Sequence, residues 1–180
     1  MAQFRYIRNS FTIEASGAYL NAMIVPHFRY CMTSWSQATK TALKPLESLY
    51  KSALKIHDKK SRRFHHCHIL VKYQFLSFEN LIIHTNLCLM YKILHDNAAP
   101  PLKEFISLGS EITARATRST VRGECRIPKR RTVFGNSAFS CVVARQWNML
   151  PIELKKSTNF YTFTRQAKKW LLSNQICPHM

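Results

Sequence analysis

The sequence has little of what catalytic chemistry on phosphodiesters requires. Its only aspartates are Asp58 and Asp96, and its seven glutamates stand singly along the 180 residues. Polymerases and nucleases generally use convergent carboxylates to hold two metal ions beside the reacting phosphate. Such sites are assembled in space rather than in sequence, but no acidic pair stands out here. We therefore expect a protein that is not an enzyme.

Glycine is also scarce, with four residues in the whole chain. The sequence contains no Walker loop, no GxGxxG fingerprint and no GxSxG nucleophile elbow. A glycine-rich loop that cradles phosphates through its backbone is therefore not expected, and the sequence predicts no cofactor.

Long apolar runs and paired cysteines are missing as well. No run approaches the roughly 18 apolar residues that a membrane span needs, and no apolar signal region follows Arg5 and Arg8. The six cysteines form no CxxC pair, which argues against the usual zinc and redox motifs. We expect reduced cysteines and a nuclear or cytoplasmic location, with a disulfide framework as the alternative because the count is even.

Positive charge is what the sequence has in excess. Lysine and arginine number 27 against 9 acids, a net charge of +18. This excess favours nucleic acid or an anionic surface as a partner. The alternative at this level is a basic surface that is simply solvated.

Much of this charge gathers in residues 115–131, here called the basic arm. Gly123 and Pro128 interrupt this segment, Glu124 is its only acid, and no apolar period would bury it. We expect it to be exposed and to contact several backbone phosphates without a fixed frame for reading bases. The predicted phosphate-binding residues are Arg115, Arg118, Arg122, Arg126, Lys129, Arg130 and Arg131, together with Arg62 and Arg63 in the polar loop 58–63.

The sequence after the arm turns apolar at helical spacing. A helix is expected from Ser137 to before Pro151, with one side formed by Phe139, Val142, Val143, Gln146, Trp147 and Leu150. Tryptophans can stack on bases, but aromatic residues on apolar helical faces are more often core residues. We therefore place Trp35, Trp147 and Trp170 in the core.

The same periodicity predicts a mainly α fold, an irregular helical domain of two small helical subdomains with a basic loop between them. Helical patterns occupy 12–35, with a break or kink at Pro26, and then 45–54, 77–96 and 160–173, while strand signals are weak. A stop at 98–101 places the boundary between subdomains 1–97 and 98–180.

One cluster has metal-ligand side chains, namely His65, His66, Cys67 and His68. On a helix only His65 and His68 would share a face, and a second ligand pair at zinc spacing is missing. A structural role is favoured over a metal site, so no metal is predicted, although metal binding stays open as the alternative.

Several sequence runs, taken in order, resemble one family. The runs are YCMTSWSQATKTALKPLESLYKSALKIHDKK (30–60), HHCHIL (65–70), SFENL (77–81), CLMYKIL (88–94), APPLKEFI (99–106), TRSTVRGEC (117–125) and RQWNMLP (145–151). In order and spacing they are similar to the carboxyl-terminal end of the reverse transcriptase polyprotein of LINE-type (non-LTR) retrotransposons. The resemblance covers the chain from about Arg5 to His179.

The resemblance implies a noncatalytic fragment that corresponds to the thumb and the following region. In that family the polymerase aspartates, including a Tyr-x-Asp-Asp motif, and the endonuclease lie upstream of the stretch matched here. The implied partners are RNA, DNA or both, bound through the phosphate backbone, and the upstream polymerase region of a related element. Two rival hypotheses are a decayed reading frame without a selected activity and a protein that binds anionic membrane surfaces.

Overall fold

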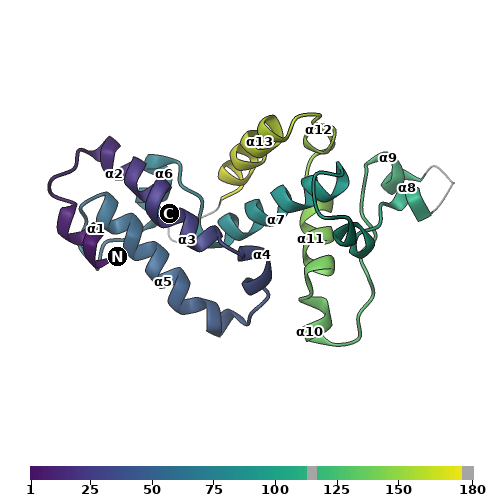
Figure 1. Ribbon diagram of the computed structural model, residues 1–180, viewed down its shortest axis with the longest axis horizontal. Coiled ribbons are helices and arrows are strands. Elements are labelled where there is room, and N and C mark those ends of the chain that lie inside the picture. Colours follow the sequence, from purple (N-terminus) through teal and green to yellow (C-terminus); the bar gives the residue numbers. More distant parts are fainter. Residues whose placement is uncertain (113–116, 176–180) are drawn as a thin grey trace. The chain divides into compact units, whose positions relative to one another are not determined.

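The protein is mainly α-helical, as its sequence predicts. The computed structural model in Figure 1 describes residues 1–112 and 117–175. Within these ranges the regular elements are helices, and the one β pairing is an isolated antiparallel bridge between Leu108 and Cys125. None of the helices in the described ranges combines the length and the apolar character that crossing a membrane demands.

The chain divides into two compact units. Unit 1 comprises Met1–Ile82 and the segment from Leu172 onward, and unit 2 comprises Ile83–Leu171. The sequence placed the division after Asn97, at a helix stop, whereas the structure divides the chain inside helix α7 (Phe78–Leu94). A breaker residue marks the end of an element. Which core a residue joins depends instead on its tertiary contacts.

Unit 1 begins with short helices and then has one long helix. Its elements are α1 (Ala2–Ile7), α2 (Ile13–Tyr19), the π-helical turn η1 (Leu20–Ile24), α3 (Val25–Arg29), α4 (Met32–Trp35), α5 (Lys40–His57) and α6 (Cys67–Tyr73). Thr12 caps α2 by accepting a 3.2 Å hydrogen bond from the amide of Ala15, and Thr39 caps α5 in the same way from Ala42 at 3.3 Å.

The break expected at Pro26 takes the form of a π-helical turn. Pro26 lies in the first turn of α3, and the preceding residues 20–24 are π-helical. Proline has no amide hydrogen, and its ring clashes with the carbonyl four residues earlier, which disfavours a regular α-helix through this point.

Aromatic packing forms the centre of unit 1. The rings of Phe28, Tyr50 and Phe78 lie 5.4–6.3 Å apart between centroids. The Tyr50 hydroxyl donates a 2.8 Å hydrogen bond to the carbonyl of Leu76, which satisfies the one polar atom that this ring brings into the core.

His57 is an ionisable group in the same core. Its side chain is 1% exposed, its Nδ1 lies 3.1 Å from the Ser16 hydroxyl, and Tyr73 and Phe75 pack edge-on against its ring. Burial lowers the pKa of His57, an effect that the Asp58 carboxylate opposes. The ring is therefore held in its neutral form.

Unit 2 packs its helices around a second aromatic cluster. Its elements are most of α7, the 3₁₀ turn η2 (Pro100–Phe105), α8 (Gly109–Ile112), α9 (Arg118–Val121), α10 (Val133–Asn136), α11 (Phe139–Asn148), α12 (Ile152–Lys155) and α13 (Phe160–Ser173). Tyr91 stacks on Phe163 with centroids 4.5 Å apart, and Trp147 lies 5.8 Å from the same ring. Helices α7, α11 and α13 thus share one core.

The core position expected for the three tryptophans holds fully for one of them. Trp147 is 2% exposed, whereas Trp35 and Trp170 are partly buried. The indole nitrogen of Trp35 donates to the carbonyl of Tyr30 at 2.8 Å, and its ring stacks on Phe78. Each therefore has a packing role, but only Trp147 is enclosed.

The cysteines differ from the expectation at one position. Cys31, Cys88, Cys125 and Cys141 are free thiols, as predicted, whereas Cys67 is disulfide-bonded. Cys177 lies outside the described residues. Widely spaced cysteines give no sequence signal for pairing, because only the fold determines which of them meet.

Trp147→Ala should destabilise unit 2. Removing this buried ring is expected to cost about 3–5 kcal/mol of unfolding free energy, the usual range for large aromatic truncations in a core. Urea unfolding followed by circular dichroism would measure the loss. Tyr161→Ala, at a ring that is 74% exposed on α13, is the control and should change stability by less than about 0.5 kcal/mol. Equal stability of the two variants would contradict the core role of Trp147.

The stability of unit 1 should fall in mild acid because of His57. Its pKa in the folded protein lies below the value of about 6.5 expected in the unfolded chain, so the unfolded chain binds more protons below that pH. The free energy of unfolding is therefore highest above about pH 6.5, where His57 is neutral in both states, and it falls as pH decreases toward the lowered pKa of His57. Urea midpoints at pH 7.5 and 5.5 should differ more for the parent than for His57→Gln. The same pH dependence in both proteins would refute this assignment.

Candidate nucleic-acid interface

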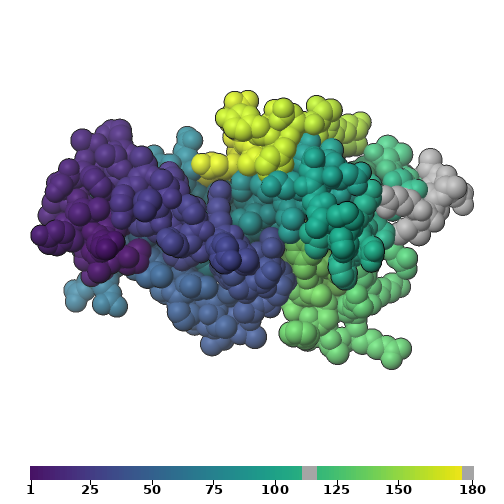
Figure 2. All heavy atoms as spheres, in the orientation of Figure 1, coloured from purple at the N-terminus to yellow at the C-terminus, as the bar shows by residue number. Residues whose placement is uncertain are grey.

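The predicted arm cations are exposed where the structure describes them. Arg115 lies outside the described residues. The other six are all exposed, namely Arg118, Arg122, Arg126, Lys129, Arg130 and Arg131. In Figure 2 side chains of this segment, coloured green, project from the surface of unit 2. The exposure predicted for the charged residues of the arm is thus confirmed for these six.

A capped helical turn orders the first part of the arm. Thr117 and Thr120 form a capping box at the start of α9, in which each side chain accepts a hydrogen bond from the backbone amide of the other. Gly123 ends the turn with a φ of +60°, a left-handed conformation that suits glycine. The turn holds Arg118 and Arg122 four residues apart, which places both on one face.

Buried Cys125 fixes the middle of the arm. The Asn148 side chain accepts a 2.8 Å hydrogen bond from the Cys125 amide and donates a 2.9 Å bond to its carbonyl. On either side of Cys125, the Gly109 amide donates to the Glu124 carbonyl, and the Arg126 amide donates to the Ser107 carbonyl, both at 2.9 Å. The backbone at Arg126 is therefore anchored although its side chain is exposed.

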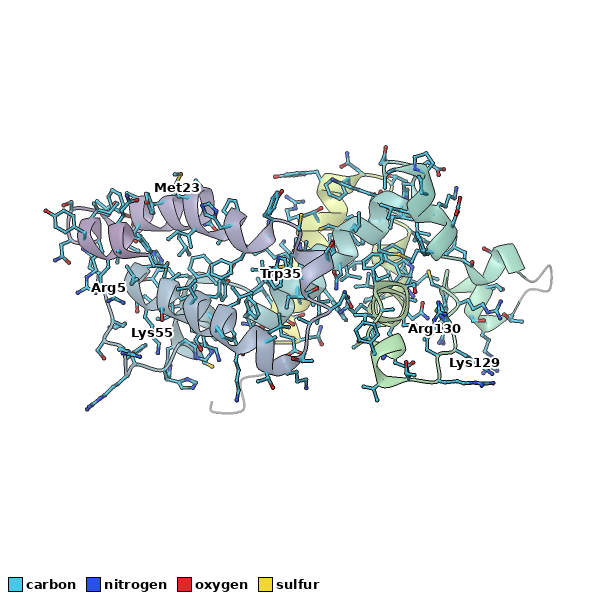
Figure 3. The ribbon with its side chains drawn as sticks, turned by 60° about the horizontal axis from the view of Figure 1, so that its bottom comes forward. Arg5, Met23, Trp35, Lys55, Lys129 and Arg130 are labelled. Carbon is cyan, nitrogen blue, oxygen red and sulfur yellow. The ribbon has the colours of Figure 1, made fainter. Side chains whose placement is uncertain are left out.

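The last part of the arm is held by α10 and α11. The Cys141 thiol donates to the carbonyl of Pro128 at 3.4 Å, and the Asn136 side chain donates to the carbonyl of Arg130 at 3.3 Å. A Cβ placed at Gly135 would lie 3.0 Å from the Cβ of Arg130, so the arm approaches α10 closely here. Figure 3 shows Lys129 and Arg130 on this segment.

These anchors change one expectation from the sequence. Glycine and proline in the arm suggested a segment without a fixed frame, but its backbone is tied down at Cys125, Pro128 and Arg130. The residues that fix the arm backbone lie outside the arm. They are Asn148, through its side-chain amide, and Trp147, whose indole donates to the Gly123 carbonyl at 3.1 Å. Neither partner can be recognised from the spacing of the arm residues.

Three arm cations border a shallow hollow. A pocket of about 410 Å³ is lined by Arg126, Lys129 and Arg130, with Glu104 as its only acidic lining residue. The ion pairs of the described residues join Lys51 to Glu47, Lys72 to Asp58 and Lys103 to Asp96, so no described arm cation takes part in one. The hollow is therefore suited to an anion that reaches several guanidinium and ammonium groups together.

Sequence reasoning missed an exposed apolar pair beside these cations. Val133 and Phe134, on α10 directly after the arm, are 89% and 86% exposed. Aromatic rings beside cationic groups stack on bases in single-stranded nucleic acids and also insert into the interface of anionic membranes. The available signal was their place outside the apolar period of α11, next to Arg130 and Arg131.

Arg62 and Arg63, the remaining predicted binding residues, belong to unit 1. Both are exposed, and the carbonyl of Arg62 accepts a 2.8 Å hydrogen bond from the Lys55 ammonium. They lie in the loop after α5, close in sequence to Lys59 and Lys60. They form a cationic group of their own.

The histidine cluster is brought together differently from the expectation. The ligand atoms of His65, His66 and Cys67 lie within 4.8 Å of one another, whereas the predicted pairing was of His65 with His68. His66 is the N-cap of α6, so its neighbours are not yet separated by helical geometry. Burial lowers the pKa of His66 to about 4, which keeps it neutral, but disulfide-bonded Cys67 offers no thiolate. The arrangement fits a structural role.

Each of the two aspartates interacts with side chains of its own unit. In unit 1 Asp58 accepts hydrogen bonds from Tyr73 at 2.6 Å and Lys72 at 3.1 Å, and in unit 2 Asp96 pairs with Lys103 at 2.8 Å. Asp58 and Asp96 are thus bound to cationic or hydroxyl partners of their own.

Comparison with known proteins identifies no family for the chain. No protein-family model, no curated protein and no solved structure matches it. The resemblance to LINE-type reverse transcriptases therefore rests on the sequence runs given above, and function has to be argued from the residues themselves.

Asn148→Ala should loosen the basic arm. The variant loses both hydrogen bonds to Cys125, at an expected cost of about 1–3 kcal/mol. Trypsin should then cleave the chain after Arg126 faster than in the parent, which mass spectrometry of timed digests would measure. Asn97→Ala, at an exposed position of the same unit, is the matched control and should cleave at the parental rate. An unchanged rate in Asn148→Ala would show that this side chain does not hold the arm.

Proposed function

We propose that the protein binds RNA or DNA through the phosphate backbone, with the basic arm as the main contact surface and without catalysis. The observation that carries this proposal is the set of six exposed arm cations, none in an ion pair among the described residues, on a backbone anchored to unit 2. An anchored backbone limits the conformational entropy that the arm loses on binding. Cations presented in this way suit a polyanion.

Binding by charge rather than by sequence follows from the form of the arm. Reading base edges in a duplex usually requires a helix or a β-ribbon that enters the major groove. Where the structure describes the arm, at 117–131, it offers only α9, a single turn of four residues, and otherwise irregular backbone. Its long cationic side chains suit phosphates, which position a nucleic acid but carry no sequence information directly.

Phe134 adds a stacking surface for single strands. Base stacking on an aromatic ring contributes roughly 1–3 kcal/mol per base and tolerates any sequence. Phe134 is 86% exposed and follows Arg130 and Arg131 closely in the chain. A single strand whose phosphates contact the arm would thus have an aromatic ring within its reach.

The resemblance to LINE-type reverse transcriptases agrees with this proposal. In that family the corresponding region grips template RNA and target DNA, while the catalytic aspartates lie upstream. A noncatalytic fragment derived from such an element would still bind nucleic acid but would lack the catalytic residues. The net charge of +18 supports the same partner class.

Binding to anionic membrane surfaces is the second candidate, and the exposed Val133 and Phe134 favour it. Apolar side chains next to basic ones are typical of interfacial membrane contacts. Vesicles containing phosphatidylserine, compared with neutral vesicles and with RNA at the same salt concentration, separate the two candidates. Tighter binding to the anionic vesicles than to RNA would favour the membrane.

Removing arm charges should reduce the salt dependence of RNA binding. If the arm neutralises four or five phosphates of single-stranded RNA, it contributes roughly −3 to the slope of log affinity against log salt, at about −0.7 per contact. The variant with Arg126, Lys129, Arg130 and Arg131 replaced by Gln should flatten the slope by up to about 3 units. Its melting temperature should stay close to that of the parent, since exposed charges contribute little to stability.

The control removes equal charge elsewhere in unit 2. Lys156, Arg165, Lys168 and Lys169 are exposed at the end of α12 and on α13, and their replacement by Gln should change the slope much less. Two unrelated RNA sequences of equal length should bind alike. An unchanged slope in the arm variant would exclude the arm from the binding surface, and a large difference between the two RNAs would reveal base reading.

A further inference from the structure

Unit 1 contains a second cationic site that is distinct from the arm. A pocket of about 710 Å³ lies against α1, the last turns of α5 and the loop that follows α5. Six cationic residues line it, namely Arg5, Arg8, Lys55, Lys59, Lys60 and Arg62. Figure 3 shows Arg5 on α1 and Lys55 on α5. Only Arg62 among the six was predicted as a binding residue. Arg5 and Arg8 reach the pocket from α1 and its C-cap, which are far from α5 in the sequence.

None of the described residues that line this pocket is acidic. Asp58 lies in sequence between Lys55 and Lys59, but its carboxylate is turned to Tyr73 and Lys72 and is 5% exposed. The remaining lining residues, Ser52, Ile56 and Ser61, carry no charge. The positive charge of the pocket is thus not neutralised by its own lining.

Hydrogen bonds between separate segments shape the pocket. The Lys55 ammonium donates to the Arg62 carbonyl at 2.8 Å, and the Lys59 ammonium donates to the Phe11 carbonyl at 3.2 Å. Lys59 has a φ of +53°, and the amide of Lys60 donates back to the carbonyl of Lys55 at 2.9 Å, which turns the chain sharply at the end of α5. The cations therefore stand on an ordered frame.

Lys55 carries its charge in an unfavourable environment. Burial lowers its pKa, and the nearby charges of Lys51 and Arg62 lower it further. An anion bound in the pocket would raise the pKa of Lys55, because an opposite charge nearby favours the ionised ammonium.

We propose that this pocket binds a terminal cluster of linked phosphates, as found in a nucleoside triphosphate or at the 5′ end of a triphosphorylated RNA. Six cations around one cavity call for several negative charges in a small volume, and a terminal phosphate carries up to about two charges where a phosphodiester carries one. The recognition uses side chains, which agrees with the lack of a glycine-rich phosphate loop.

The lining also argues against the interior of a nucleic-acid strand as the ligand. Within the pocket each phosphodiester would bring its sugar and base, and the part of the chain that the structure describes contributes no aromatic residue to the lining that could receive a base. A phosphate terminus enters without these groups. The nucleoside or the rest of the RNA then stays outside, so the site distinguishes a phosphorylated end from a chain interior and does not distinguish one base from another.

Binding of inorganic tripolyphosphate, measured by titration calorimetry, tests the proposal directly. At matched ionic strength, tripolyphosphate should bind at least tenfold more tightly than sulfate or orthophosphate. Arg8→Gln combined with Arg62→Gln should weaken tripolyphosphate binding at least tenfold, and Arg5→Gln combined with Lys60→Gln provides an independent variant at exposed positions. Lys40→Gln with Lys44→Gln removes the same charge from the exposed start of α5 and should bind as the parent does.

The outcomes separate this site from the proposed function. The arm variant with four Gln residues should retain tripolyphosphate binding in full, whatever it does to the salt slope for RNA. Two RNAs of one sequence, with a 5′-triphosphate or a 5′-hydroxyl, together with a free nucleoside triphosphate, identify the source of the phosphates. Equal affinity for sulfate, or an equal loss in the Lys40 and Lys44 control, would overturn the proposal.

Discussion

Repulsion among unpaired positive charges is the constraint on which the structure depends. With 27 lysines and arginines against 9 acids, most cations have no acidic partner available to them. The described ion pairs engage Glu47, Asp58 and Asp96, each with one lysine. Ion pairing therefore cannot hold the cationic segments in place, and exposed pairs would add little in any case. Folding must instead rely on apolar burial and on backbone hydrogen bonds, which leave the charges unneutralised and open to an external anion.

The two cationic sites are held by apolar burial and backbone hydrogen bonds in different ways. In unit 2, Trp147 and Asn148 are consecutive residues at the end of α11, and both reach the arm backbone, at Gly123 and at Cys125. The packing of Trp147 in the aromatic core thereby sets the position of the arm. In unit 1, the ammonium groups of Lys55 and Lys59 themselves donate to backbone carbonyls and shape the pocket that they line. The arm is an exposed strip suited to an extended polyanion, whereas the pocket is a concave cluster suited to a compact one.

Periodicity and breakers predicted the helical fold class and the α11 helix well, because burial of an apolar stripe is a local property of the sequence. The exposure of the arm cations also followed from local composition. The division inside α7, the anchoring of Cys125 by Asn148 and the pocket between α1 and α5 could not be predicted, because each depends on residues distant in the chain. Val133 and Phe134 were missed for another reason. Apolar residues are expected in a core, and the one local signal against burial was the place of this pair outside the apolar period of α11.

The left-handed backbone at Gly123 has an evolutionary consequence. A Cβ added there would meet no atom within 4 Å, yet a residue with a Cβ is strained at a φ of +60° by about 1–2 kcal/mol. The cationic heads around it are free of such restrictions, because lysine and arginine serve equally where only charge is needed. Sequence drift in this segment would therefore exchange and shift its basic residues readily while retaining an uncharged glycine. A search for descendants of this surface should therefore follow the glycine at position 123 rather than the individual basic residues.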